Sequence, residues 1–285
     1  MKLKFSKNFS KLISFFIIAS ICSSFLTGCA SDNEQKNKIA NMRNLFSEEK
    51  FIIHACGEIA DESGTIYDYT NSKEALENSY ANGNRIIEVD FHYTSDHVLV
   101  CGHAWGDLYL DGKQMTPGEA PTYDEFMKCK VMDKFTALTF DDIAEFMKKN
   151  EDLVIVTDTK ETDIDTYKTI AKKYPELTDR FVVQIYHASE YDDVKKAGFP
   201  LIIYTLYEAT ENELTKNSLL KAAKKNLVGF TYHIDLLDNP AFEDIMKQTD
   251  TPKYIHTVNS NEDIQRCFDS GAVAVYTDRT DLMFQ

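Results

Sequence analysis

Three acidic side chains lie in or at the ends of apolar, β-rich runs of this 285-residue chain. Glu88 and Asp90 are two residues apart in one run, so in a strand they point to the same face. Asp158 ends the next long run. Carboxylates on an inward face are costly unless they are paired or bind a metal. An all-oxygen set suits a hard divalent cation, Ca²⁺ or Mg²⁺, better than zinc. We therefore predict a cation site at these three residues.

Two histidines accompany these acids along the chain. His54 ends the first β-rich run, and His103 follows a short extended run after the second. Imidazole titrates near neutral pH, so the two side chains can act as general base and general acid. Lys160, two residues after Asp158, adds a positive charge for a phosphate oxygen. Together these groups predict metal-assisted phosphoryl transfer. The alternative is a non-catalytic salt-bridge network of the acids with Arg85 or Lys160.

Alternating β-rich runs and helical patterns predict the fold. Most of the runs are apolar nearly throughout, as in strands covered on both faces. The alternation fits a single (β/α)8 TIM barrel. A doubly wound open sheet is the alternative, but the sequence contains no G-x-G-x-x-G motif or phosphate-binding loop to support it. The strands are expected at Phe51–Ala55, Arg85–Phe91, Leu153–Thr157, Phe181–Ile185, Leu201–Tyr204, Leu227–Thr231, Lys253–Thr257 and Val273–Tyr276. The helices are expected at Ser72–Asn82, Phe140–Lys149, Ile164–Tyr174, Tyr191–Lys196, Glu211–Lys225, Pro240–Lys247 and Asn261–Ser270.

One segment, residues 92–138, interrupts the alternation. It contains a hairpin-like stretch, Tyr93–Cys101, and then a stretch with glycine and proline, Gly106–Thr122. Loops of this length in a compact domain are usually functional or have structure of their own. We predict an extended loop or hairpin insertion after the second strand, above the carboxyl ends of the first strands, where barrel enzymes build their active sites.

The first 28 residues have the pattern of a secretory signal peptide. They contain four lysines and no acid, followed by an apolar run, Leu12–Leu26, that is short for a stable membrane span. The run ends in Leu26-Thr27-Gly28-Cys29, which resembles a bacterial lipobox and implies cleavage before Cys29 and lipidation of that residue. The alternative is an uncleaved membrane anchor. Both predict an extracytoplasmic, membrane-anchored protein. With cleavage, the lipidated cysteine and a polar tether occupy residues 29–50, and the barrel occupies residues 51–285.

Composition narrows the classes of partner. The chain has 31 basic and 46 acidic residues, a formal net charge of -15, which disfavours binding to nucleic acid. We expect a monomer. The four cysteines of the barrel region form no C-x-x-C pair, so a zinc ribbon or thioredoxin-type motif is disfavoured. Either a Cys56–Cys101 disulfide forms, or these residues are small buried hydrophobes.

The chain contains, in order, the motifs His54-Ala55-Cys56-Gly57, Thr70-Asn71-Ser72, Glu88-Val89-Asp90, His103-Ala104-Trp105, Asp158-Thr159-Lys160, Thr257-Val258-Asn259, Gly271 and Thr277-Asp278. In this order they resemble the motifs of the glycerophosphodiester phosphodiesterase family, within the phosphatidylinositol-phospholipase-C-like barrels. The resemblance implies that His54 and His103 act as general base and acid. It implies that Glu88, Asp90 and Asp158 bind the cation and that Lys160 contacts the substrate phosphate or the metal ligands.

Four positions depart from the family pattern. Ala55 stands where the family has arginine, Thr70 where it has glutamate, Asp158 where it has glutamate, and Ala104 where it has aspartate. Further candidates for substrate contact are Gln184 and Tyr186 at the end of the fourth strand and Trp105 beside His103.

The site residues and the family resemblance support three hypotheses of function. The first is a surface-anchored, cation-dependent phosphodiesterase for glycerol- or polyol-phosphate diesters, such as deacylated phospholipids, teichoic-acid-like polymers or capsule components. The second is a non-catalytic lipoprotein that binds a phosphorylated ligand. The third is a phospholipase acting on intact lipid, which predicts an exposed apolar rim at the barrel mouth.

Overall fold

The computed structural model describes residues 33–160 and 164–282. The signal peptide and Cys29 lie outside these residues, so their assignment stays a prediction. No helix within the described ranges combines the length and apolar character needed to cross a membrane.

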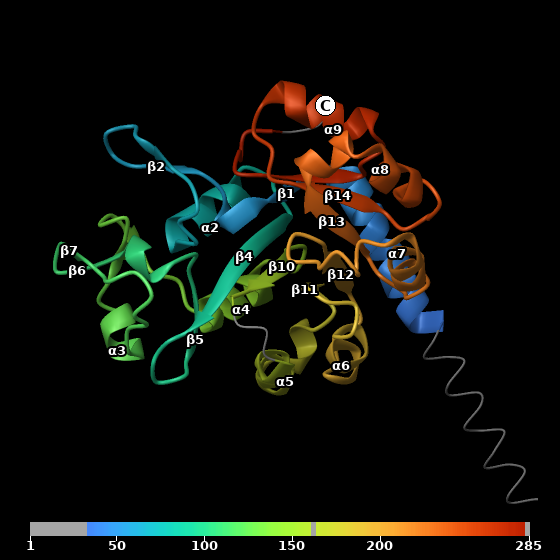
Figure 1. Ribbon diagram of the computed structural model, residues 1–285. Coiled ribbons are helices and arrows are strands. Elements are labelled where there is room, and N and C mark those ends of the chain that lie inside the picture. Colours follow the sequence, from blue (N-terminus) through green and yellow to red (C-terminus); the bar gives the residue numbers. More distant parts are fainter. Residues whose placement is uncertain (1–32, 161–163, 283–285) are drawn as a thin grey trace, which may run out of the picture.

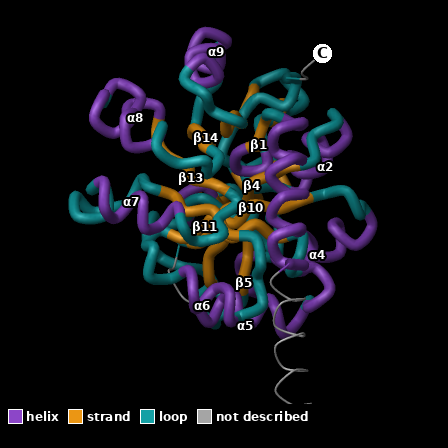
Figure 2. Tube along the Cα trace, turned by 90° about the vertical axis from the view of Figure 1, so that its right-hand side faces the viewer, coloured by secondary structure: helices purple, strands orange, loops and turns teal. Residues whose placement is uncertain are grey.

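Eight parallel strands close into a barrel at the centre of the molecule (Figures 1 and 2), as the sequence predicts. Neighbouring strands follow chain order, and the barrel closes where β1 pairs with both β15 and β4, through Ile53 opposite Thr277 and Ile87. All eight predicted strands are confirmed, with ends that move by one or two residues. They are β1 Phe51–Ile53, β4 Ile86–Tyr93, β10 Val154–Thr159, β11 Phe181–Ile185, β12 Ile202–Thr205, β13 Gly229–His233, β14 Lys253–His256 and β15 Ala274–Thr277.

Helices surround the barrel, and capping residues account for several of their ends (Figure 2). Thr139 and Asp142 form a capping box at the start of α4, and Ser260 accepts a hydrogen bond from the Asp263 amide at the start of α9. The predicted helix at residues 211–225 is shorter, because its first turn begins only after the Thr215 cap. The helices are α2 Lys73–Ala81, α4 Phe140–Lys149, α5 Ile164–Lys173, α6 Tyr191–Lys196, α7 Lys216–Ala223, α8 Pro240–Met246 and α9 Asn261–Asp269.

The segment predicted as a polar tether is instead helical at residues 33–49. Ile39, Met42 and Phe46 lie three and four residues apart, so they share one helix face, and all three are buried. They pack on apolar side chains from the barrel strands, and the Arg43 guanidinium donates to the carbonyl oxygens of Leu227 and Val228. The prediction was wrong here because three spaced apolar residues in a polar stretch give a weak amphipathic pattern.

The insertion after β4 is a small substructure with its own core. Strand β5 Leu99–Cys101 pairs antiparallel with β4, and a separate four-stranded sheet follows (Figure 1). Trp105, Leu108, Phe126, Val131 and Phe135 are buried together. The remaining elements on this side of the barrel are the hairpin strands β2 Ile59–Ala60 and β3 Ile66–Tyr67, the insertion strands β6 Leu108–Leu110, β7 Lys113–Gln114, β8 Lys130–Val131 and β9 Phe135–Thr136, and the helix α3 Tyr123–Phe126.

The cysteines of the barrel region follow the second of the two predicted alternatives. Cys56, Cys101, Cys129 and Cys267 are all free and buried. In this structure they serve as small apolar side chains in the core.

Candidate active site

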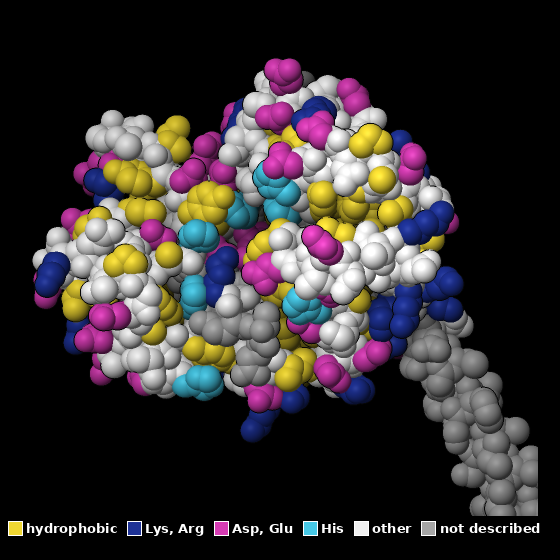
Figure 3. All heavy atoms as spheres, in the orientation of Figure 1, with side chains coloured by type: hydrophobic (Ala, Val, Ile, Leu, Met, Phe, Trp, Pro, Cys, Tyr) yellow, Lys and Arg dark blue, Asp and Glu magenta, His cyan; other side chains and the backbone are white. Residues whose placement is uncertain are grey.

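One cavity of about 650 Å³ opens at the carboxyl ends of the barrel strands, where barrel enzymes place their chemistry. In the space-filling view it is the hollow in which histidine, acidic and lysine side chains meet (Figure 3). The residues that line it are His54, Tyr69, Glu88, His103, Asp158, Lys160, Gln184, Thr205, Leu206, Tyr207, Ala209, Leu214, His233, Asp235, Leu236, His256, Thr257 and Tyr276.

The three predicted cation ligands come together beside this cavity, which Glu88 and Asp158 line and next to which Asp90 lies. On β4 the inward face passes from Ile86 at the bottom of the barrel to Glu88 and Asp90 nearer the mouth, and all three are buried. Asp158 of the neighbouring strand β10 stands directly opposite Asp90 in the strand register. Carboxylate oxygens of Glu88, Asp90 and Asp158 lie within 4.8 Å of one another.

Burial and mutual repulsion make this acid cluster electrostatically unfavourable by itself. Burial, followed by the charge of Asp90, raises the pKa of Glu88 to about 8. Burial also raises the pKa of Asp158 to about 6, against the opposing effect of Lys160. Burial acts on Asp90 as well, but Lys160 and His54 hold the pKa of Asp90 below its usual range. A cluster in which two of three carboxylates resist ionisation gains most from a bound cation.

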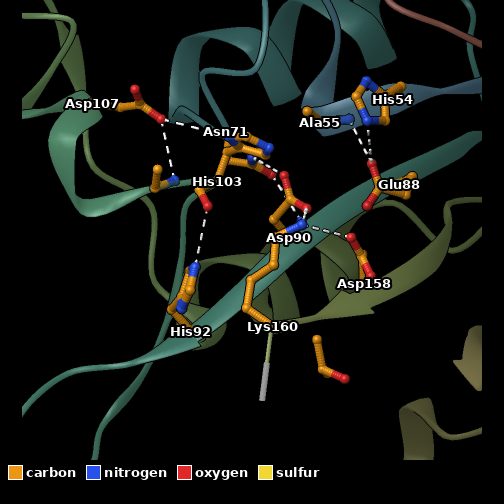
Figure 4. Close-up of polar contacts among 12 residues, drawn as sticks. His54, Ala55, Asn71, Glu88, Asp90, His92, His103, Asp107, Asp158 and Lys160 are labelled. Atoms are coloured by element: carbon orange, nitrogen blue, oxygen red, sulfur yellow. Dashed lines mark hydrogen bonds and ion pairs between the residues drawn. The ribbon is translucent and has the colours of Figure 1, made fainter. Parts of the chain in front are cut away.

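Lys160 supplies one counter-charge from within the chain (Figure 4). Its Nζ lies 2.6 Å from Asp90 Oδ1 and 2.7 Å from Asp158 Oδ2. Part of the alternative salt-bridge network therefore exists, whereas Arg85 pairs with Asp152 and not with the cluster. One ammonium leaves the three acids incompletely neutralised, and Asp158 Oδ1 is buried without a hydrogen-bond partner. The donor set thus fits a hard, oxygen-seeking divalent cation.

His54 is held by residues from the closing strands of the barrel. Its Nδ1 lies 2.7 Å from Asp278 Oδ1, and Asn259 Nδ2 donates to the other oxygen of Asp278 at 2.6 Å. Its Nε2 lies 3.9 Å from Glu88 Oε2. Burial disfavours the imidazolium, but the hydrogen bond to Asp278 and the charges of Glu88 and Asp90 outweigh it and raise the pKa of His54 to about 9.

His103 comes from the insertion and has looser surroundings. Its side chain is 41% exposed, and its Nδ1 lies 3.9 Å from Asp107 Oδ2. Partial burial lowers the pKa of His103, although Asp90 and Asp107 act in the opposite direction. The residue after His103 is Ala104, where the family pattern has aspartate, but Asp107 brings a carboxylate near the ring from one turn further along. His92 contacts the backbone carbonyl of His103 rather than the acid cluster (Figure 4).

Tyr69 lies between the two histidine rings and was missed in the sequence. Its ring centroid is 4.6 Å from that of His54 and 4.8 Å from that of His103, edge to face in both cases. Tyr69 and Asn71 have φ angles of 54° and 44°, in the left-handed region that glycine favours. The Asn71 side chain fixes this strained turn, because it donates to Asp90 Oδ2 at 2.7 Å and accepts from the Asp90 amide at 3.0 Å.

The further candidates for substrate contact divide into one inside the cavity and two outside it. Gln184 lines the cavity, where its Oε1 accepts from the Tyr276 hydroxyl at 3.1 Å. Tyr186 is buried, and its hydroxyl donates to the Thr159 carbonyl at 3.2 Å. Trp105 packs in the insertion core, with its ring centroid 4.8 Å from that of His92. Neither Tyr186 nor Trp105 is among the described residues that line the cavity, and their role as substrate contacts stays a prediction.

Asp278, Asn259, Tyr69 and Asp107 were not predicted as site residues. For Asp278 and Asn259 a signal was present, since both lie in the matched motifs Thr277-Asp278 and Thr257-Val258-Asn259. For Tyr69 the sequence offers none, because its contacts with the two histidine rings depend on how two loops meet over the barrel mouth. For Asp107 the signal was its position four residues after His103 in the same loop.

A parallel barrel with buried acids and two histidines at its carboxyl-terminal mouth defines a class, the phosphodiester-cleaving barrel enzymes. A sequence profile of the glycerophosphoryl diester phosphodiesterase family matches residues 63–282. The chain belongs to that family and is therefore a phosphoric diester hydrolase. A search of curated proteins gave no significant match.

Solved structures with the same fold share few residues with this chain. A glycerophosphoryl diester phosphodiesterase from Parabacteroides distasonis has a TM-score of 0.64 and 10% identity, with 85% of this chain and 89% of that chain covered. One from Thermotoga maritima has a TM-score of 0.59 and 16% identity, with coverage of 82% and 96%. A phosphodiesterase from Oleispira antarctica, solved with the product sn-glycerol-3-phosphate, has a TM-score of 0.58 and 15% identity, with coverage of 81% and 94%. At such identities the likeness concerns the fold.

Proposed function

We propose that this chain hydrolyses glycerophosphodiesters with a divalent cation at Glu88, Asp90 and Asp158, and with His54 and His103 as general base and general acid. The observation that carries the proposal is the arrangement of two histidines on either side of Tyr69, above one buried acid cluster in a single cavity. The product of the Oleispira enzyme, sn-glycerol-3-phosphate, is consistent with such a substrate.

Each group has a role that its surroundings support. Asp278 accepts from Nδ1–H of His54, which leaves the Nε2 lone pair of that ring free to take a proton. When bound, the cation neutralises charge on the phosphate oxygens and activates the phosphorus. Its charge also opposes that of a protonated His54, which favours the neutral, basic form of the ring.

The two histidines carry the two proton transfers of the proposed reaction. His54 Nε2 removes a proton from water or from a neighbouring substrate hydroxyl while the oxygen–phosphorus bond forms. His103 gives a proton to the leaving alkoxide as the ester bond to phosphorus breaks. Because His103 is 41% exposed, it can exchange protons with solvent between turnovers.

A non-catalytic binder is the second candidate, favoured by the pairing of Lys160 with Asp90 and Asp158. Hydrolysis of glycerophosphocholine and bis-p-nitrophenyl phosphate separates the two, measured with Ca²⁺, with Mg²⁺ and with EDTA. We expect turnover that EDTA lowers about 100-fold or more and that the cation restores. Asp158→Asn should match the EDTA result without loss of fold. Cation binding in calorimetry without any turnover would instead support the binder.

Action on intact lipid has less support. The large apolar side chains exposed among the described residues are Ile66, Val98, Met127 and Tyr207, and only Tyr207 lines the cavity. An apolar rim that could enter a bilayer is therefore not formed by these residues.

We also propose that the chain is secreted and anchored at the outer face of a membrane through lipidated Cys29. The support is the basic, apolar and Leu26-Thr27-Gly28-Cys29 pattern of the first 29 residues. Labelling with radioactive palmitate tests it. Wild-type protein should incorporate label in the membrane fraction, and Cys29→Ala should not. An unlabelled wild-type protein that still fractionates with membranes would favour the uncleaved anchor.

A further inference from the structure

The cavity extends well beyond the acid cluster. From the catalytic groups it continues to a second region formed by the loops after β12 and β13 and by the ends of β13 and β14. We call this region the alcohol end of the cavity. It consists of Leu206, Tyr207, Leu214, His233, Leu236 and His256. At about 650 Å³ the whole cavity is in the range of sites that enclose a complete small molecule, so it can hold more than a phosphate group.

Charge differs between the two ends. Within the described lining, Lys160 is the one lysine or arginine, and it lies at the catalytic end. The alcohol end is bordered by an acid, Asp235, whose carboxylate is 3.1 Å from His233 Nδ1. Burial lowers the pKa of His256 to about 3, so this ring is uncharged at neutral pH. A phosphate can therefore find a counter-charge at the catalytic end, whereas a second anion at the alcohol end meets a carboxylate.

The walls of the alcohol end are apolar and aromatic. Leu206, Leu214 and Leu236 come from two loops that converge there. Tyr207 is 48% exposed, with its ring centroid 5.9 Å from that of His256 and 5.5 Å from that of Tyr186. The ring centroid of Tyr276 is 6.0 Å from that of His256. Covering such a surface with the C–H groups of a ligand is favourable and stabilises the complex.

Tyr207 joins the two ends. Burial raises the pKa of Tyr207 well above its usual range, and the charge of Asp158 acts in the same direction. The hydroxyl is therefore protonated at neutral pH, and because Tyr207 lines the cavity it can donate a hydrogen bond to a bound diester.

We propose that the alcohol end binds the part of the diester remote from the reacting phosphorus, and that it selects a group that lacks negative charge and presents a C–H face. A neutral ring polyol and a cationic amino alcohol both have this chemistry. A polyol-phosphate polymer does not, because its next phosphate would approach Asp235. This inference rests on the proposed phosphodiesterase function and narrows its substrates.

Four diesters of glycerol 3-phosphate test it, with kcat/KM measured under the same cation conditions. The remote alcohol is methanol, inositol, choline or inositol 4-phosphate, so that size and charge change separately. We expect the inositol and choline diesters to exceed the inositol 4-phosphate diester by about tenfold or more. Hydrolysis of the methyl diester reports the proposed function alone. If the anionic diester is hydrolysed as well as the neutral one, the selection is overturned.

Variants of Tyr207 and Asp235 test whether the substrate selection arises at the alcohol end. Tyr207→Ala should lower kcat/KM for the inositol and choline diesters at least fivefold more than for the methyl diester, with Tyr207→Phe in between. Met127→Ala is the matched control, because Met127 is 50% exposed and lies outside the cavity lining. Asp235→Lys should raise kcat/KM for the anionic diester at least fivefold. Equal losses on all diesters in Tyr207→Ala would contradict the proposal.

If wild type hydrolyses none of the diesters, the proposed function fails and the subsite is tested by binding. Calorimetry with the inositol and inositol 4-phosphate diesters in the presence of Ca²⁺ should then still give tighter binding of the neutral ligand. Tyr207→Ala should remove the difference. Equal affinities in wild type would overturn the subsite as well.

Discussion

The two histidines at the barrel mouth differ in how firmly a carboxylate holds them. His54 is bound by Asp278, 224 residues away in the chain, and Asp278 is in turn held by Asn259. His103 has its nearest carboxylate in its own loop, four residues away, at a distance too long for a hydrogen bond. The pKa is raised for His54 and lowered for His103. The comparison shows how one cavity can give two identical side chains different proton affinities. Without a cation this order is the reverse of the proposed roles of base and acid, and a cation beside Glu88 and Asp90 would lower the pKa of His54.

Removal of either histidine tests the comparison most directly. His54→Ala and His103→Ala should each lower kcat by about 1,000-fold or more, because each side chain carries a proton in the reaction. Steady-state kinetics with glycerophosphocholine measures this, and circular dichroism checks the fold. His97→Ala is the control, since His97 stacks on Tyr93 away from the cavity lining. Wild-type activity in His103→Ala would leave the insertion without a catalytic role.

Loss of the carboxylate beside His54 should lower kcat more than loss of the carboxylate beside His103. Asp278→Asn removes a carboxylate at 2.7 Å and should lower kcat about 100-fold, since the ring loses both its orientation and its counter-charge. Asp107→Asn removes a carboxylate that lies 3.9 Å from His103 and should lower kcat by less than about tenfold. The pH profile of kcat/KM should shift in the first variant and stay nearly unchanged in the second. Equal losses in the two variants would mean that the two sides do not differ as described.

Tyr69 links the two sides, so its substitution should affect both histidines. Tyr69→Ala removes a ring that contacts both imidazoles and should lower kcat about tenfold, with a changed pH profile. Tyr69→Phe keeps the ring and should stay within about threefold of wild type. If Tyr69→Ala lowers only the melting temperature and leaves the pH profile as it was, the residue supports the fold and does not position the histidines.

The smallest expected effect is on stability. The pKa of His54 is raised to about 9, so its stabilising contribution is complete below the unfolded value of about 6.5 and is lost as the pH rises through 9. The pKa of Glu88 is raised to about 8, so its ionisation also opposes folding as the pH rises towards that value. Without a divalent cation, the melting temperature should fall by about 3–5 °C between pH 6.5 and pH 9.

Differential scanning calorimetry with EDTA and with millimolar Ca²⁺ measures this slope. The cation should reduce it, because the ionised carboxylates then gain a partner. Glu88→Gln should reduce the slope as well, whereas Glu145→Gln, at an exposed carboxylate of α4, should not. A melting temperature that rises with pH in EDTA would contradict the pKa directions of His54 and Glu88.

Much of the barrel could be predicted because its signals are local. Each strand is a short apolar run such as Phe181–Ile185, and each clear helix start carries a cap such as Thr139. The acid cluster could be predicted for the same reason, since Glu88 and Asp90 share a face by strand geometry alone. Parallel pairing of β4 with β10 then brings Asp158 beside them.

Sequence reasoning is least informative where a residue's partner lies elsewhere in the chain. The helix at residues 33–49 depends on a surface that only the closed barrel offers to Ile39 and Phe46. Trp105 stands two residues after His103, yet the insertion core buries it. Tyr186 points to the Thr159 carbonyl rather than to the cavity.

The amino-acid sequence by itself determined the alternation of strands and helices, the acidic inward face and the family pattern, because these depend on residue type and short spacing. Only the tertiary structure decided which groups surround each histidine. Closure of β1 on β15 brings Asp278 to His54, while the strained turn at Tyr69 and Asn71 places an aromatic ring between His54 and His103. Hydrogen bonds and burial act over a few ångströms of space, and chain order does not state those distances.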